Sequence, residues 1–390
     1  MAMVRELEDE PFGIFVWSAY RLLVTWVAAK RDIRRELYNP GGIEALVLKI
    51  AGISGFSLGA ATNSPSGGLV LLLASLLEDS PNEWEQALAA LTVSEWALSR
   101  GFTETALAYS GLAAGLGNTS RHAWLAGRLH RRHARPHEAE AWYLAADAAA
   151  TREKDWETKA RALNSQGRLA LDVGRYPDAR KLFGRALKVA QRYKLRDREV
   201  ETHHHLFAVG VATHDHALAD QEIERVISGY GPDHPKLPTF AHDLAAYWMD
   251  KGDYGNALNV LTTLLERHFK DASASRLLVL GSAARATGGA IKPGMFDMLH
   301  AEFTRLRSRG PETLLHAQAL LLVARGAASL RRWKLAKECL TEALASSRRT
   351  AQKDTEILAE QLLAQVGQQL QTEREHVPSV TNRELARRAI

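Results

Sequence analysis

The chain has 390 residues, of which 46% are hydrophobic and 24% are charged, a composition typical of a folded protein. The net charge of +5 is small for this length, so composition alone gives no evidence for nucleic-acid binding. The single cysteine, Cys339, excludes an internal disulfide and a cysteine-rich zinc module and favours a reducing, cytoplasmic compartment.

The first apolar segment, residues 12–29, is predicted to form a buried packing helix. It follows several acidic residues, whereas a secretory signal begins with positive charge. It also carries Arg21 and is shorter than the roughly 20 residues that span a bilayer. An interfacial membrane helix and a true span are the weaker alternatives, and no stable membrane insertion is expected.

A repeated helical hairpin begins further along the chain, and its clearest copy is residues 163–190. One helix is predicted to end at Gly174, and Pro177 opens a second, because proline loses nothing in the first helical turn. Small residues and one aromatic ring mark where the two helices touch. These markers are Gly167, Ala179, Phe183 and Ala186.

The same residue types recur 40 positions earlier, which gives the pattern a period. The earlier copies of the markers are Gly127, Ala139, Tyr143 and Ala146. The marker alanines at 139, 179, 219 and 257 are separated by 40, 40 and 38 residues. Further hairpins are expected from Trp84, around Pro293 and before Ala336, so the chain is predicted to hold about seven.

These markers resemble the tetratricopeptide repeat family, which places glycine or alanine at position 8, alanine at 20, an aromatic at 24 and alanine at 27. The resemblance covers roughly residues 84–350, with a period longer than the usual 34. It implies an all-α fold, a right-handed α-solenoid of about seven hairpins with helical caps. The first helix of each hairpin would line a concave groove, and such grooves usually bind peptides or partner proteins.

The resemblance divides the chain into a repeat region, residues 81–350, and two flanking regions. Residues 1–80 are predicted to form an apolar, helical N-terminal cap, since a solenoid needs a cap at each open end. A second interpretation is that this region also forms a homodimer surface. Residues 351–372 are predicted to form a C-terminal capping helix, and 373–390 a flexible tail.

In this family, positions 2, 5, 9, 12 and 13 of the first helix point into the groove. The residues at these positions in the hairpin that begins near residue 120 are Arg121, Trp124, Arg128, Arg131 and Arg132. The next hairpin contributes Arg161, Asn164, Arg168, Leu171 and Asp172, and the following two place His204 and His242 at position 5. A run of arginines can clasp carboxylates, because the guanidinium fork pairs with planar anions. The alternative is that arginine is simply a soluble residue on an exposed helix face.

Fifteen histidines raise the question of a metal site. Adjacent helical residues point about 100° apart, so only one of His203, His204 and His205 faces any given direction. His130 and His133 have a suitable spacing, but no HExxH motif accompanies them. No metal site is predicted.

The sequence holds no phosphate loop, no GxSxG elbow and no dinucleotide-binding glycine motif. Cys339 is expected to be a buried, inert thiol. We therefore expect no enzymatic activity and no cofactor, but a scaffold or adaptor that binds a protein or peptide, acidic in character. An alternative is a peptide-sensing regulator of transcription or of an effector, although residues 43–77 lack a basic recognition helix and no DNA binding is expected. RNA binding along the groove is a weaker alternative.

Overall fold

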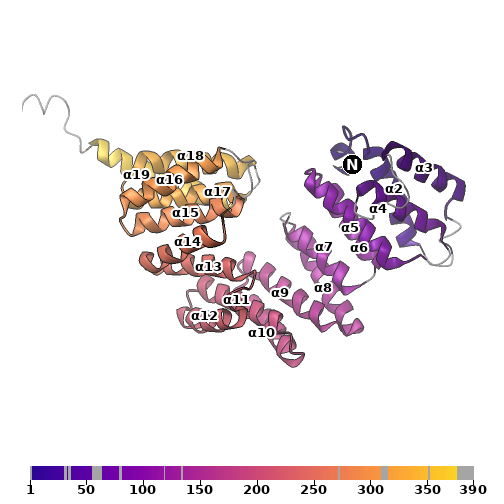
Figure 1. Ribbon diagram of the computed structural model, residues 1–390, viewed down its shortest axis with the longest axis horizontal. Helices are drawn as coiled ribbons and strands as arrows, with labels where there is room; N and C mark the ends of the chain where they lie inside the picture. Colours follow the sequence, from indigo (N-terminus) through magenta and orange to yellow (C-terminus); the bar gives the residue numbers. More distant parts are fainter. Residues whose placement is uncertain are drawn as a thin grey trace, which may run out of the picture. The chain divides into compact units, whose positions relative to one another are not determined.

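The computed structural model of the protein describes residues 2–29, 33, 37–54, 64–78, 81–117, 119–132, 135–270, 273–308, 315–349 and 352–375. All regular secondary structure in these residues is helical (Figure 1). Two compact units divide the chain, unit 1 from Met1 to Gly229 and unit 2 from Tyr230 to Ile390.

The N-terminal helices of unit 1 are α1 (Ala2–Glu6), α2 (Gly13–Ala28), α3 (Pro40–Ser54), α4 (Pro65–Ala74) and a 3₁₀ turn (Ser75–Leu77). They share one hydrophobic core with the first hairpin, α5 (Glu83–Ser99) and α6 (Thr103–Gly117). The buried hydroxyl of Tyr109 donates to the Val16 carbonyl at 2.7 Å. The Glu6 carboxylate accepts the backbone N–H of Thr105 at 2.9 Å, which satisfies a free donor at the start of α6. Residues before 80 are therefore tied to the first hairpin by polar as well as apolar contacts.

The apolar segment 12–29 forms α2, and it packs as expected, with Val16 and Leu23 fully buried. No helix in the described ranges is both long enough and apolar enough to cross a membrane. Ile14 and Leu48 remain 65% and 70% exposed. Homodimerisation through residues 1–80 stays a prediction.

The remaining helices of unit 1 alternate as first and second helices of hairpins: α7 (Ser120–Arg132), α8 (Pro136–Glu153), α9 (Trp156–Asp172), α10 (Tyr176–Arg192), α11 (Arg196–Ala212) and α12 (His216–Tyr230). The predicted turn between α9 and α10 is confirmed. Gly174 has φ +76°, a left-handed conformation that glycine adopts without strain, and Pro177 lies in the first turn of α10. Gly167 lies against the buried Phe183 ring, as the marker pattern requires.

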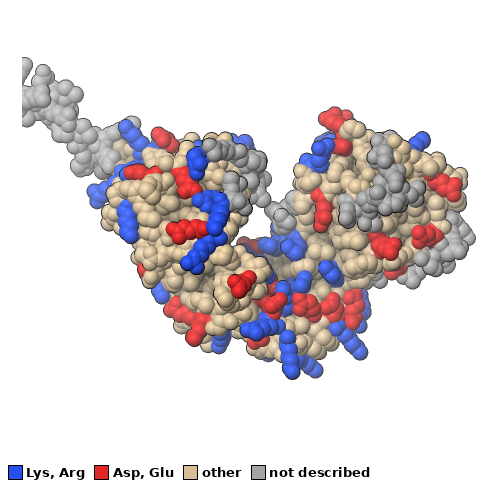
Figure 2. All heavy atoms as spheres, in the orientation of Figure 1, with Lys and Arg blue, Asp and Glu red and all other residues tan. Residues whose placement is uncertain are grey.

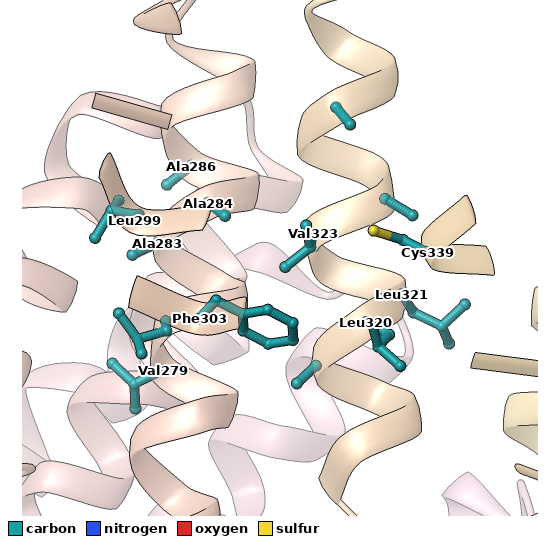
Figure 3. Packing of buried hydrophobic residues seen from close by; sticks show 14 of the residues in the cluster. Val279, Ala283, Ala284, Ala286, Leu299, Phe303, Leu320, Leu321, Val323 and Cys339 are labelled. Atoms are coloured by element: carbon teal, nitrogen blue, oxygen red, sulfur yellow. The ribbon is translucent and has the colours of Figure 1, made fainter. Parts of the chain in front are cut away.

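Unit 2 continues with α13 (Leu237–Asp250), α14 (Tyr254–Arg267), α15 (Ala274–Gly289), α16 (Pro293–Arg307), α17 (Leu315–Ser329), α18 (Trp333–Arg349) and α19 (Lys353–Glu375). Pro293 opens the second helix of a hairpin, as predicted. The hydrophobic core of unit 2 includes Phe303 of α16, Val279 and Ala283 of α15 and Val323 of α17 (Figure 3). Cys339 is buried, and desolvation raises the pKa of its thiol to about 11. Helix α19 covers most of the expected capping segment, residues 351–372, and continues to Glu375, three residues into the expected tail of 373–390. The rest of that tail lies outside the described residues, and the capping role of α19 stays a prediction.

Successive first helices contact one another directly, α7 with α9 and α9 with α11 in unit 1, and α13 with α15 and α15 with α17 in unit 2. A surface built from first helices therefore runs from hairpin to hairpin within each unit. The right-handed superhelix stays a prediction.

Ion pairs also join neighbouring hairpins at equivalent positions. These are counted so that the marker alanine is position 20, a place that Phe296 takes in the hairpin of α15 and α16. Each pair links position 21, on a second helix, to position 16, in the turn of the following hairpin. These pairs are Glu140 with Arg175 at 3.0 Å, Arg180 with Asp215 at 3.7 Å and Asp297 with Arg332 at 3.0 Å. All three are exposed, so each contributes about 0.2–1 kcal/mol.

Candidate peptide-binding surface

Arg121, Trp124 and Arg128 lie on one face of α7, because they are separated by three and four residues. Trp124 is half-buried, and its indole packs beside Tyr143 and Leu169. The indole N–H donates to the Ser165 hydroxyl of α9 at 2.9 Å. This bond joins two successive first helices and fixes the orientation of the ring.

Two guanidinium groups lie over the Trp124 ring. The guanidinium carbon of Arg128 is 4.8 Å from the ring centroid, and that of Arg161, from α9, is 5.1 Å away. Such contacts contribute about 0.5–1 kcal/mol at exposed sites. Arg161 also pairs with Glu157 at 2.9 Å, so its charge is shared with a carboxylate of its own helix.

The predicted run of arginines is not a uniform set of free cations. Asp172 accepts from Arg131 at 3.1 Å and from Arg168 at 2.9 Å, and so neutralises part of the charge on both. Arg121 and Arg128 are exposed, and neither has a carboxylate within ion-pair distance in the parts of the chain that the structure describes. The uncompensated charge is therefore on α7.

The structure corrects the expectation that Asn164 faces a ligand. Its side chain is buried, with 3% exposure, and its amide donates to the Thr202 hydroxyl of α11 at 3.0 Å. The Thr202 hydroxyl in turn donates to the Arg198 carbonyl at 2.6 Å. Asn164 therefore joins α9 to α11. A buried amide needs such a partner, because only a hydrogen bond offsets the free-energy cost of removing it from water.

The last three predicted residues do not join this surface in the described structure. The side chain of Arg132 lies outside the described part of the chain. His204 is half-buried, with its ring 6.1 Å from that of His205. His242 belongs to unit 2, where Nε2 is 2.8 Å from the Ser282 hydroxyl.

The histidines that drew attention to metal binding have other contacts. His203 is buried, and its Nδ1 lies 2.6 Å from a carboxylate oxygen of Glu222, which also pairs with Arg225 at 2.9 Å. Within the described residues, no three His, Cys, Asp or Glu side chains are placed to hold one ion.

Sequence reasoning missed two contacts that shape the site, the ion pair of Arg161 with Glu157 and the bond of Trp124 to Ser165. Glu157 could have been found, because it precedes Arg161 by one helical turn, the spacing of a helix ion pair. The bond from Trp124 to Ser165 spans 41 residues and depends on how α7 packs on α9. No local pattern indicates it.

Neither the known family models nor the curated proteins contain a match to this chain. Among solved structures, yeast Tom70 is similar over 98% of this chain and 84% of its own, with 13% identity and a TM-score of 0.51. A Rap protein complexed with competence and sporulation factor aligns over 92% and 99%, with 10% identity and a TM-score of 0.49. The pilF protein of Pseudomonas aeruginosa aligns over 58% and 95%, with 18% identity and a TM-score of 0.41. The described helices form an α-solenoid of the tetratricopeptide type.

Proposed function

We propose that the protein is a scaffold that binds a protein or peptide partner on the first-helix surface of α7 and α9. The observation that carries this proposal is the fixed Trp124 ring with Arg121 and Arg128 beside it on one helix face. A pre-oriented aromatic ring loses little entropy on binding, and aromatic and arginine side chains dominate the energetics of protein interfaces.

The bound segment is acidic, because the two arginines of α7 have no intramolecular carboxylate in the described residues while Arg131 and Arg168 do. Their charges can therefore pair with Asp, Glu or a chain terminus of a partner. Elsewhere, basic and acidic side chains are interspersed over the face seen in Figure 2, which favours a local site over a long phosphate-binding stripe.

The proposal predicts the outcome of a peptide selection with the full-length protein. The wild type is expected to enrich peptides that combine Asp or Glu with an apolar residue. Arg128→Glu should weaken a selected peptide at least tenfold, about 1.4 kcal/mol, because it places a like charge beside the ligand. Isothermal titration calorimetry measures the affinities, and binding should weaken as salt is raised.

Arg152→Glu is the matched control, because Arg152 is exposed on the second helix α8 and undergoes the same change of charge. It should bind the selected peptide as the wild type does. Equal affinity of wild type and Arg128→Glu would contradict the proposal. Strongly salt-dependent binding of polyuridylate that Arg128→Glu removes, without peptide binding, would assign the surface to RNA instead.

A further inference from the structure

A cavity of about 340 Å³ opens between α17, α18 and α19 in unit 2. Trp333 and Leu340 of α18 and Leu362 and Val366 of α19 supply apolar walls, and the small Ala328 of α17 leaves room for the space. Small-molecule sites in proteins span about 300–1,000 Å³, so this volume fits one small group rather than a folded partner.

Among the described residues that line the cavity, Arg325 of α17 is the one that carries a charge, and it is half-buried. In the described part of unit 2, no carboxylate lies within ion-pair distance of its guanidinium. A cation that is partly removed from water and has no carboxylate partner in the protein is stabilised when an anionic ligand binds beside it.

In the preceding hairpin, the arginine equivalent to Arg325 has a carboxylate partner that Arg325 lacks. Arg285 stands at the equivalent position of α15, 40 residues earlier, and pairs at 2.6 Å with Asp250, which lies 35 residues before it. The residue 35 positions before Arg325 is Ala290, which carries no charge. Burial lowers the pKa of Arg325, the positive charge of Arg285 lowers it further, and Asp250 raises it. The site is therefore short of negative charge.

Polar donors on α19 complete the lining. Gln365 and Gln369 are one helical turn apart and both line the cavity together with Arg325. Their amide groups can donate N–H bonds to an oxygen anion, while their oxygens cannot neutralise a cation. The lining thus combines a guanidinium and amide donors with an indole and aliphatic walls.

We propose that this cavity binds a carboxylate attached to a compact apolar or aromatic group. Arg325 pairs with the carboxylate, and Trp333, Leu340 and Leu362 enclose the apolar part. A free organic acid and the C-terminal carboxylate of a peptide share this chemistry. The site lies in unit 2 and uses no residue of the α7–α9 surface, so it stands independently of the proposed function.

Calorimetry on the full-length chain tests the proposal with 3-phenylpropionate and its uncharged amide. We expect saturable binding of the acid and at least tenfold weaker binding of the amide. A tripeptide that ends in phenylalanine, with a free or amidated C-terminus, forms the second arm. Tighter binding of the free peptide than of phenylpropionate would identify a polypeptide end as the source of the carboxylate, and the reverse order a free acid.

Three variants locate the binding. Arg325→Gln should weaken the acid at least tenfold, and Ala328→Phe should abolish binding by filling the cavity. Arg305→Gln, an exposed arginine of α16, should bind as the wild type does. Circular dichroism checks that each variant folds. Wild-type affinity of Arg325→Gln, equal affinity for acid and amide, or no binding of either carboxylate at millimolar concentration would overturn the proposal.

Discussion

Two glycines of the same hairpin have opposite surroundings. A Cβ atom added to Gly167 of α9 would lie 2.6 Å from the Phe183 ring, which is fully buried, so one of the two must shift. A Cβ atom added to Gly184 of α10 would have no atom within 4 Å. The first glycine is needed for helix packing, and the second is not.

We predict that Gly167→Ala lowers the free energy of unfolding of unit 1. Overpacking typically costs about 1–3 kcal/mol, and alanine returns roughly 0.5–1 kcal/mol through its higher helix propensity. The net loss should be roughly 1–2 kcal/mol, measured by urea denaturation followed by circular dichroism.

Gly184→Ala is the control, because it makes the same chemical change where space is open. It should stabilise the unit by about 0.5–1 kcal/mol. An unchanged urea midpoint for Gly167→Ala would mean that Phe183 can repack.

The packing residues could be predicted from the sequence more fully than the site residues. Gly167, Ala179 and Phe183 were assigned correctly, because the shape of a close helix contact restricts the residue types and repeats them. No repeating pattern of residue types indicates whether an arginine is free or paired with a carboxylate. Arg131 donates to Asp172, which lies 41 residues further along the chain, and only the packing of α7 on α9 brings the two side chains together.

At the level of elements, polar bonds between successive first helices give the stack its register. Trp124 bonds to Ser165 between α7 and α9, and Asn164 bonds to Thr202 between α9 and α11. A buried amide is tolerated only where its partner lies opposite, so the second bond restricts how α11 can slide along α9.

Thr202→Val tests this bond. The change keeps the side-chain shape but leaves the buried Asn164 amide without its acceptor, which should cost about 1–3 kcal/mol of unfolding free energy. Urea denaturation measures the loss. Thr213→Val is the matched change at an exposed hydroxyl, which bonds to the Val209 carbonyl of its own helix at 2.8 Å, and should stay within about 0.5 kcal/mol of wild type. A similar small effect for both variants would show that water or another group can satisfy Asn164.

At the level of the whole molecule, the repeat pattern predicts the hairpins but not the division into two units. The marker alanines at 219 and 257 continue the period across residue 230, where one unit ends and the other begins. The markers report contacts within a hairpin, whereas the division depends on contacts between hairpins. The sequence therefore indicates a continuous array.

The two units should differ in native-state hydrogen exchange of the full-length protein. Contacts in a repeat array are made mainly with neighbours, so regions with different cores can open separately. In increasing denaturant, helices α9 and α10 should lose protection at one concentration and α15 to α18 at another. Coincident loss of protection on both sides of residue 230 would show one cooperative unit.

The ion pairs between positions 21 and 16 favour some orders of hairpins over others. The hairpin of α7 and α8 carries Arg135 at position 16, paired with Glu104, and Glu140 at position 21. A tandem duplication of that hairpin creates one new junction, where Glu140 of the first copy would meet Arg135 of the second, a pair of opposite charges. The hairpin of α9 and α10 carries Arg175 and Arg180 at these positions, so its duplication would place two arginines together. A copy of the first hairpin would therefore gain an ion pair at its new junction, whereas a copy of the second would lose about as much free energy to the like charges.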